Sequence, residues 1–595
     1  MGFVKTVKIL YGYLRPYRRR VALGVLCLLG VDALSILPPL VLKEFIDHAG
    51  RVFSRSLSGG YWAAFLPFLL LGLAYALIAC GQGAFRYAWR VYLIKSSHRA
   101  AERIRDDYFS KLQRLPPSFY DRHPIGDLMA LATNDVEAVR FALGPGLLVF
   151  ADAVFLFLVL PPAMLALSPR LTLVSLAPMA LVPFVIGWAE KLVHRRFERV
   201  QAQFSKLTAF AQEDIEGIRI VKAFVREWTQ LERFGALGKD FVRLNVKLAR
   251  AQSIFEPVFI LSVGAGLAAL LFFAGSDVIG GRVPLGTFVA FTRYLDQLVW
   301  PMMAFGLAVT YYQRGKGSLK RIVEVLSEKE DDAPAARQPA RAPIFDETAP
   351  LLEIRGLTFA YGHDEPVLKN VNLRIASGEW VALVGPVGSG KSTIVKLLSG
   401  LYPAPRGTVF WKGVDVSDLT LKARRQELAV VPQETLLFSD SLGANVMLGL
   451  NSGAGEDQDR FFSAALSRAA LISGEREWKF EMPIGEKGSN LSGGERARVT
   501  LARAFVREAP LLVLDDALSN IDASTEGRIL DRFEDNENSL LMITNRFARL
   551  SLFDRVYVLK AGEIAQAGSA AELSRVPGLY RQLLELQLLE DELAH

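Results

Sequence analysis

The chain has little cysteine and little charge for its length, and each shortage excludes a class of protein. Only two of its 595 residues are cysteines, and both Cys27 and Cys80 lie within apolar runs. A disulfide framework is therefore not expected, and neither cysteine has the histidine and cysteine neighbours of a metal site. Charged residues make up 22% of the chain and hydrophobic residues 51%, with a mean hydropathy of +0.24. This composition is too apolar for a soluble protein of this size and predicts membrane-spanning segments.

The basic residues do not form the single stripe that a nucleic-acid-binding protein presents. The net charge is +7, but lysines and arginines cluster beside apolar runs, where they orient a protein in a membrane. We therefore expect no nucleic-acid partner. No small-residue cleavage site follows the first apolar segment, which is expected to be an uncleaved span. The length is too great for one core and predicts several domains.

Six apolar segments in the first half are each long enough to cross a bilayer, which takes about 20 residues. They are predicted at 21–46, 61–85, 141–163, 165–190, 254–275 and 286–311. The links after the second and fourth segments are long, basic and helical in period, so the second to fifth spans are expected to continue as helices well beyond the bilayer. The positive-inside bias places both long links and both termini in the cytoplasm. Residues 1–327 are thus predicted to be a transmembrane domain.

Charged residues within these spans are candidate functional residues, because a charge at membrane depth is costly. They are Asp32, Asp152, Arg293 and Asp296. In one interpretation they line a substrate pathway for cationic or amphipathic compounds. In the other they pair within the helix bundle, for example Arg293 with Asp296 one turn later. Membrane lipid, which surrounds the spans, is also an expected partner.

The second half has the composition of a soluble domain. Residues 328–350 are rich in proline, alanine and charge, as linkers are. From Leu351 to the end of the chain, strand-like runs alternate with helical ones, which predicts an α/β domain with a mainly parallel sheet at 351–595.

A phosphate-binding loop stands near the start of this domain. The buried-strand run Trp380–Val384 precedes two glycines with four residues between them, a lysine and a hydroxyl residue, and helical spacing follows. Its residues are Gly385, Pro386, Val387, Gly388, Ser389, Gly390, Lys391, Ser392 and Thr393. Backbone N–H groups of such a loop surround phosphates, the lysine reaches the β and γ oxygens, and the Ser392 hydroxyl can bind Mg²⁺. The loop predicts binding of a nucleoside triphosphate.

Further motifs follow in order around this loop. Tyr361 could stack on an adenine base, and Gln433, after an apolar strand, could contact Mg²⁺ and the attacking water. Asp515 ends an apolar strand and is suited to hold Mg²⁺, with Ser519–Asp522 just beyond it. A helix N-terminal anion site is predicted at Leu491, Ser492, Gly493, Gly494 and Glu495.

This ordered set resembles the ATP-binding-cassette family, and six spans ahead of one cassette resemble an exporter half-transporter of the bacterial inner membrane. The segments 119–122, 126–128 and 217–224 look like the exporter's intracellular helices, and 484–488 resembles the segment before the signature. The resemblance implies ATP and Mg²⁺ as cofactors and a hydrophobic small molecule or lipid as substrate. It also implies a second half-transporter as partner, because each ATP lies between one chain's phosphate loop and the other chain's signature.

Two positions depart from the family pattern. Members that hydrolyse ATP well carry glutamate directly after the Mg²⁺ aspartate, where this chain has Asp516, and histidine where it has Asn545. A carboxylate one methylene shorter is pulled back from its target, and asparagine cannot carry the charge or proton of imidazole. Together these departures resemble the degenerate subunit of a heterodimeric multidrug or lipid exporter, whose partner supplies the intact residues. The alternatives are a homodimeric lipid flippase and a non-catalytic nucleotide-binding regulatory subunit.

Overall fold

The computed structural model describes residues 3–54, 61–330, 345–362, 365–450, 457–472, 477–534, 538–547 and 549–594. The chain divides into two compact units, one of Met1–Gln113 with Ile125–Glu328 and the other of Arg114–Pro124 with Lys329–His595. The short segment Arg114–Pro124 thus belongs to the second unit, although the hydropathy pattern assigned all of 1–327 to the membrane domain. Most of the linker predicted at 328–350, namely 331–344, lies outside the described residues.

The first unit is helical throughout its described part. Its elements are α1 (Phe3–Leu14), η1 (Arg15–Tyr17), α2 (Arg18–Ser35), α3 (Leu37–Ser54), α4 (Tyr61–Leu112), α6 (Ile125–Ala130), η2 (Leu131–Asp135), α7 (Val136–Phe141), η3 (Ala142–Gly146), α8 (Leu147–Leu167), α9 (Pro169–Leu176), η4 (Pro178–Leu181), α10 (Val182–Glu216), α11 (Ile218–Ala223), α12 (Glu227–Gln252), α13 (Phe255–Ile279) and α14 (Leu285–Ser327). The 52 residues of α4 far exceed the roughly 20 that a bilayer needs, so this helix extends well beyond its apolar part.

Among the described residues, four helical stretches are long and apolar enough to cross a membrane: Lys8–Val52, Phe65–Leu112, Ile125–Leu167 and Glu227–Ile279. Of the other two predicted spans, 165–190 is interrupted, whereas 286–311 is continuous helix. The segment 165–190 is divided at Pro178, where a 3₁₀ turn separates α9 from α10, because proline lacks the N–H that a continuous helix needs. The segment 286–311 lies in α14, whose apolar stretch contains Arg293, Asp296 and Gln297.

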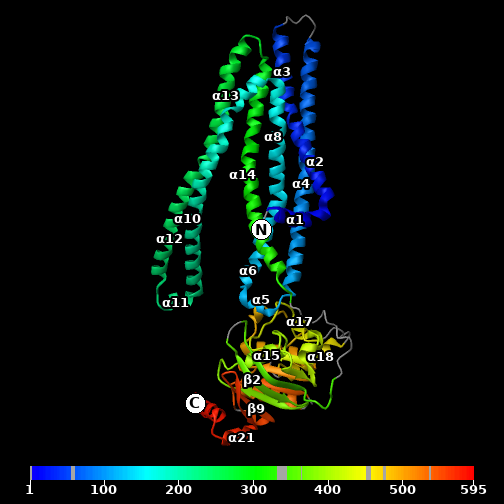
Figure 1. The fold of residues 1–595 in the computed structure, drawn as a ribbon, viewed down its shortest axis with the longest axis vertical. Coiled ribbons are helices and arrows are strands. Elements are labelled where there is room, and N and C mark those ends of the chain that lie inside the picture. The colour runs from blue at the N-terminus through cyan, green and yellow to red at the C-terminus, as the bar shows by residue number, and fades with distance from the viewer. Residues whose placement is uncertain are drawn as a thin grey trace. The chain divides into compact units, whose positions relative to one another are not determined.

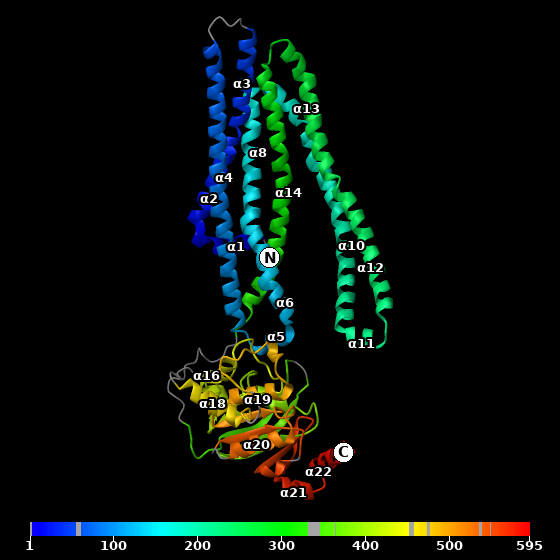
Figure 2. The ribbon, with the colours of Figure 1, turned by 180° about the vertical axis from the view of Figure 1, so that it is seen from behind.

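The helices of this unit pack in two groups, which Figures 1 and 2 show from opposite sides. In one group α2 lies along α4, and α14 packs against α3, α7 and α8. In the other, α10 and α12 run side by side and are joined at one end by α11. A core of large apolar side chains, among them Leu160, Met164, Phe291 and Tyr294, lies between α8, α9, α13 and α14.

The second unit is an α/β domain with two sheets. Its strands are β1 (Leu352–Phe359), β2 (Leu368–Ile375), β3 (Trp380–Val384), β4 (Val409–Trp411), β5 (Val414–Asp415), β6 (Leu428–Val431), β7 (Leu511–Asp515), β8 (Ser539–Ile543), β9 (Arg555–Lys560) and β10 (Glu563–Gly568). Its helices are α5 (Pro117–Arg122), α15 (Lys391–Leu398), η6 (Val416–Asp418), α16 (Leu421–Gln426), α17 (Leu442–Met447), α18 (Gln458–Arg468), η7 (Glu486–Gly488), α19 (Gly493–Phe505), α20 (Ala523–Glu534), η8 (Leu550–Leu552), α21 (Ala570–Arg575) and α22 (Leu579–Ala594).

The larger sheet places the predicted site residues along one edge. Its strand order is β10-β9-β3-β8-β7-β6, and every pair is parallel except β10 with β9. All five residues of β3, β7 and β8 are buried, which explains their continuous apolar sequences. Because Leu383 and Asp515 both lie opposite Ile543, the carboxyl ends of β3, β7 and β8 meet at the edge where ligands bind α/β sheets.

Candidate functional site

The loop between β3 and α15 has the backbone of a phosphate-binding loop. Gly385, Gly388 and Gly390 have φ angles of +154°, +80° and +104°. These conformations favour glycine, and a Cβ on Gly385 would overlap the carbonyl oxygen of Leu559. The chain therefore curls at three points before α15 begins at Lys391, so that N–H groups can converge on an anion.

Two polar groups in this loop fit a triphosphate. The ammonium group of Lys391 donates to the carbonyl oxygens of Gly385 at 2.7 Å and Pro386 at 2.9 Å, and burial lowers its pKa. The Ser389 hydroxyl is buried and has no hydrogen-bond partner among the described residues. Phosphate oxygens would accept from Ser389 and would supply a negative charge for Lys391, so both groups are matched to the expected ligand.

A hydroxyl and a carboxylate beside the loop are placed to hold Mg²⁺. Ser392 Oγ donates to Asp515 Oδ1 at 3.2 Å, which joins the start of α15 to the end of β7. Asp515 is buried, and this burial raises its pKa. Mg²⁺ prefers oxygen ligands and commonly binds one or two protein groups together with substrate phosphates. The pair therefore fits a metal ion that arrives with ATP.

Asp516 lies close to Gln433. Gln433 Nε2 donates to Asp516 Oδ2 at 3.3 Å, and the Ser519 hydroxyl donates to the backbone oxygen of Asp516 at 2.8 Å. Burial raises the pKa of the Asp516 carboxyl, which favours a group that accepts a proton. Asp516 itself has a φ of +49°, an uncommon value for a residue other than glycine. The raised pKa suits a general base. Asp516 therefore differs from the glutamate of the family pattern mainly in the shorter length of its side chain.

Asn545 follows β8 and its side chain is exposed at the same edge of the sheet. The next residue, Arg546, makes the contacts that the sequence pattern did not predict. Its guanidinium donates to the backbone oxygens of Ser519 at 2.6 Å and Ile521 at 3.2 Å and forms an ion pair with Glu526 at 3.1 Å. Arg546 thereby fixes the segment Ser519–Asp522 beside β8. The sequence did not predict this role, because one arginine after an apolar strand forms no recognisable motif.

An aromatic cluster lies next to the first turn of α15. The hydroxyl of Tyr361 donates to Thr393 Oγ1 at 3.1 Å, and its ring meets that of Tyr402 edge to face at 5.0 Å between centroids. The Tyr402 hydroxyl in turn donates to the carboxylate of Asp121 on α5. Burial and the Asp121 carboxylate raise the pKa of Tyr402. The residue predicted to stack on adenine is thus linked through Tyr402 to α5.

The predicted signature segment forms the start of α19. Ser492 is the N-cap, its hydroxyl accepts from the backbone N–H of Glu495 at 3.2 Å, and the Glu495 carboxylate accepts from the N–H of Ser492 at 2.8 Å. This capping box explains Glu495, and the spacing of serine and glutamate could have predicted it. It also places a negative charge at a helix N-terminus where the motif predicts an anion.

The predicted membrane charges lie in the first unit, apart from this site. Asp152 on α8 accepts a hydrogen bond from the indole N–H of Trp300 on α14, and Asp32 on α2 is buried. Arg293 and Asp296 are exposed on α14. No ion pair joins these two in the described part of the chain.

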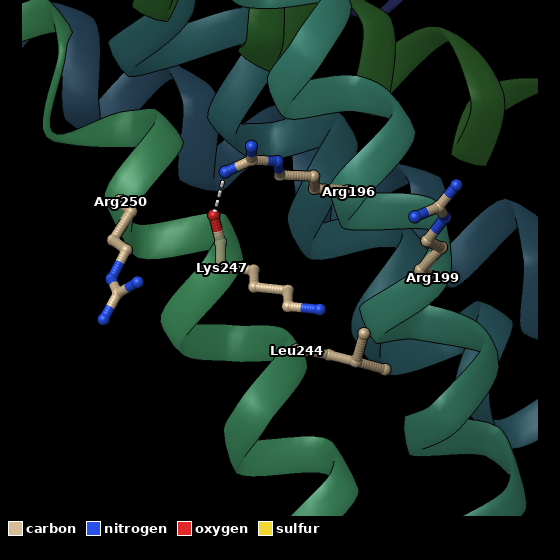
Figure 3. Close-up of a pocket in the computed structure, with 5 residues that line it drawn as sticks. All are labelled: Arg196, Arg199, Leu244, Lys247 and Arg250. Carbon is tan, nitrogen blue, oxygen red and sulfur yellow. Dashed lines mark hydrogen bonds between the residues drawn. The ribbon is translucent and has the colours of Figure 1, made fainter.

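A basic hollow lies between α10 and α12, and Figure 3 shows its lining. Its volume is about 340 Å³, and the residues around it are Arg196, Arg199, Leu244, Lys247 and Arg250. The Arg196 guanidinium donates to the backbone oxygen of Lys247, which holds the two helices together at this point. Four of the five lining side chains are cations, in keeping with the basic links read from the sequence.

The helical unit and the cassette-like site define a membrane transporter that uses ATP. Comparison with protein families agrees: the ABC transporter transmembrane region matches residues 21–302, and the ABC transporter nucleotide-binding family matches residues 368–519. The chain belongs to the ABC transporter family, as an exporter with its transmembrane and ATP-binding domains on one polypeptide. It is therefore a multi-pass inner-membrane protein, and the predicted fold class is confirmed.

Relatives match the chain over nearly its whole length. It is 32% identical to the multidrug resistance-like ATP-binding protein MdlA of Escherichia coli, with 97% of this chain and 96% of MdlA covered. It is 28% identical to the ATP-dependent lipid A-core flippase of Syntrophus aciditrophicus, with 97% and 94% covered. A solved bacterial Atm1-family ABC exporter with ATP bound has the same fold, with a TM-score of 0.75, 24% identity and 96% and 98% covered.

Proposed function

We propose that this chain is one half of a heterodimeric exporter and that its own phosphate loop binds ATP with little turnover. The observation that carries the proposal is Asp516, which occupies the base position with one methylene too few beside an intact Lys391, Ser392 and Asp515. A misplacement of about 1 Å in a positioned reaction costs on the order of 100-fold. Asn545 adds a second loss, because an amide cannot take over the proton or charge of imidazole.

In this proposal the signature Leu491, Ser492, Gly493, Gly494 and Glu495 serves the partner's ATP rather than the chain's own. The glycines and the N-terminal amides of α19 support that role. The partner's site supplies the hydrolysis that drives transport. The basic hollow between α10 and α12 and the links around it favour a cytoplasmic location for this end of the helices and for both termini.

The expected cargo is an amphipathic compound or a lipid. Support comes from the relatives, since one is named for multidrug resistance and another as a lipid A-core flippase. Support also comes from Asp32, Asp152, Arg293 and Asp296, which place polar groups within helices of the membrane unit. A homodimeric lipid flippase is the second candidate and is favoured by the flippase relatives; it requires Asp516 and Asn545 to suffice for hydrolysis.

Copurification from the native host tests the assembly. The tagged chain is expected to bring down a second half-transporter that carries glutamate after its Mg²⁺ aspartate and histidine after the following strand. A complex of this chain alone would contradict the heterodimer and support the flippase. ATP-dependent uptake of substrate into inverted vesicles separates both from a regulatory subunit, which would bind ATP without transport.

A further inference from the structure

The basic hollow between α10 and α12 has no counter-charge in the described part of the chain. Both helices contribute cations to it, namely Arg196, Arg199, Lys247 and Arg250. Among the described residues, no carboxylate forms an ion pair with any of these four side chains. Like charges around a space of about 340 Å³ repel one another, so the hollow is suited to an anion.

The nearest acidic residue of each helix already has another partner. On α10, the Glu198 carboxylate lies 3.4 Å from His194 Nε2, and on α12, the Asp240 carboxylate lies 3.0 Å from the guanidinium of Arg243. None of these four residues lines the hollow. The positive charge of the hollow is therefore available to a ligand.

The side chains around the hollow suit a phosphate group. Arg196 uses one of its N–H groups on the backbone oxygen of Lys247, and Figure 3 shows the Lys247 side chain extending from α12 toward α10. A guanidinium has five N–H donors in a planar fork that matches phosphate oxygens, and an ammonium group adds three more. The contact between Arg196 and Lys247 also fixes the spacing of the two helices, so these donors are held close together.

The hollow lies close to the predicted ends of two membrane spans. Arg196 follows the span 165–190 by six residues, and Arg250 precedes the span 254–275 by four. At 1.5 Å per residue, these cations lie about 6–9 Å beyond the apolar segments. The headgroup layer on each side of a bilayer is about 5–8 Å thick. The cations are therefore expected at or just beyond the depth of lipid headgroups.

Exposed aromatic side chains lead from the hollow into the span. Phe184 is 78% exposed and Trp188 is 62% exposed, and both lie on α10 within the predicted span 165–190. Phe184, Trp188 and Arg199 follow one another at intervals of four and eleven residues, which places them on one face of the helix. A molecule with an anionic head and apolar chains matches this face, since tryptophan favours the membrane interface.

We propose that the hollow binds the headgroup of an anionic phospholipid, and that a lipid with two phosphates, such as cardiolipin, binds it most tightly. The phosphates accept from the arginines and Lys247, and the acyl chains lie along Phe184 and Trp188. Two phosphates offset the four cations better than one. In the cytoplasmic orientation proposed above, basic pockets between membrane helices suit such headgroups. This lipid is bound and not transported, so the inference goes beyond the proposed function and holds for either dimer.

Lipid binding to the purified full chain in detergent tests the inference. Native mass spectrometry counts the bound molecules of cardiolipin, phosphatidylglycerol and phosphatidylcholine as each lipid is titrated. Cardiolipin is expected to bind most tightly and phosphatidylcholine least. Arg199→Gln with Lys247→Gln should weaken cardiolipin binding about 30-fold, because each basic residue near a membrane surface contributes about fivefold.

A matched double variant controls for charge. Arg233→Gln with Lys239→Gln removes the same two residue types from exposed positions on α12, and Lys239 lies more than two turns from Lys247. Cardiolipin binding to this control should match that of wild type. Cardiolipin should also raise the melting temperature of wild type and of the control, but not that of the first variant. The melting curve without lipid shows whether each variant is folded.

Inorganic phosphate distinguishes a lipid from a soluble anion. Millimolar phosphate should leave cardiolipin bound, because the acyl chains contribute to its affinity. Displacement by phosphate would assign the hollow to a soluble anion instead. Equal binding of phosphatidylcholine and cardiolipin, or an equal loss in the two double variants, would also overturn the proposal. ATP-driven transport is measured separately, and its absence beside intact lipid binding would contradict only the exporter function.

Discussion

Asp515 and Asp516 are adjacent residues at the end of β7 with different tasks. Asp515 is buried and accepts from Ser392, whereas Asp516 accepts from Gln433, which follows the end of β6. Burial raises the pKa of both carboxyls, so the nucleotide-free site is held under electrostatic strain at neutral pH. Mg²⁺ and ATP would relieve that strain, since Mg²⁺ would bring a cation to the carboxylates and the phosphates would bring an anion to Lys391.

Replacement of Asp515 tests this account. Because its pKa is raised in the folded chain, the neutral carboxyl contributes stability that is present at acid pH and lost as pH rises through the raised value. Asp515→Asn should therefore raise the melting temperature of the nucleotide-free chain near pH 7 by about 2–4 °C, the shift expected of 1 kcal/mol. The gain should shrink toward pH 4. Mg²⁺ with ATP should raise the melting temperature of this variant much less than that of wild type. Thermal unfolding in detergent measures both; a lower melting temperature at pH 7 would refute the strain.

Restoring the two missing groups should restore chemistry. Asp516→Glu extends the carboxylate by one methylene, and Asn545→His supplies imidazole at the exposed position after β8. The double variant is expected to hydrolyse ATP at least 10-fold faster than wild type, since about 100-fold is at stake in placing the base. Phosphate release by the purified chain measures it. The pair Asp516→Asn with Asn545→His controls for the carboxylate, and a rate equal to that of the Glu variant would exclude the carboxylate as the cause.

Two helices of the second unit, α19 and α5, carry hydrogen bonds that bear on the candidate site. The capping box of α19 stabilises the helix start but sets the Glu495 carboxylate beside the anion site. The helix α5 belongs to the second unit, where Asp121 accepts from Tyr402.

Neutralising Glu495 should strengthen the signature. Glu495→Gln keeps an oxygen that can accept from the N–H of Ser492 and removes the negative charge. In the assembled transporter, the apparent affinity for ATP should rise about two- to fivefold, the factor that 0.3–1 kcal/mol at a helix N-terminus gives. Glu572→Gln is the matched control, because Glu572 closes the same capping box with Ser569 on α21. The apparent affinity is read from ATPase rates at increasing ATP concentrations. An equal rise for Glu495→Gln and Glu572→Gln would show that helix capping, not charge at the signature, is responsible.

Removing one hydroxyl should lower the stimulation of ATPase by substrate and leave ATP binding nearly unchanged. Tyr402→Phe keeps the ring beside Tyr361 and loses the hydrogen bond to Asp121. ATP binding should stay within about twofold, whereas stimulation of ATPase by substrate should fall severalfold, as loss of one hydrogen bond to a charged group predicts. If the bond is responsible, Asp121→Ala and the double variant should behave alike. Additive effects would mean that Tyr402 and Asp121 act independently.

The sequence was sufficient where function depends on local chain geometry. The glycines of the phosphate loop, the strand before Asp515 and the order of motifs all follow from short-range spacing. It was insufficient where residues far apart meet: Asp152 with Trp300, Tyr402 with Asp121, and Arg546 with Ser519 are joined only by the packing of whole elements. The division at Pro178 shows an intermediate case, since the proline was visible but its 3₁₀ turn depends on neighbouring helices.

At the scale of the whole molecule, we propose that the chain combines a complete apparatus for binding ATP with an incomplete one for cleaving it. Lys391, Ser389 and the glycines of the loop are positioned for phosphate, and Asp515 for Mg²⁺. In the proposed assembly the signature on α19 faces the partner's ATP, because each chain's loop faces the other chain's signature. In the proposed heterodimer, two unequal sites divide ATP binding and ATP turnover between them.

ATP hydrolysis by the purified chain without any partner tests this division most directly. We predict a rate close to the background of Lys391→Ala, in which the phosphate loop is disabled, while ATP binding by wild type remains clear. A substantial rate from the chain alone, whether or not Asp516→Ala abolishes it, would contradict the account and favour the homodimeric flippase.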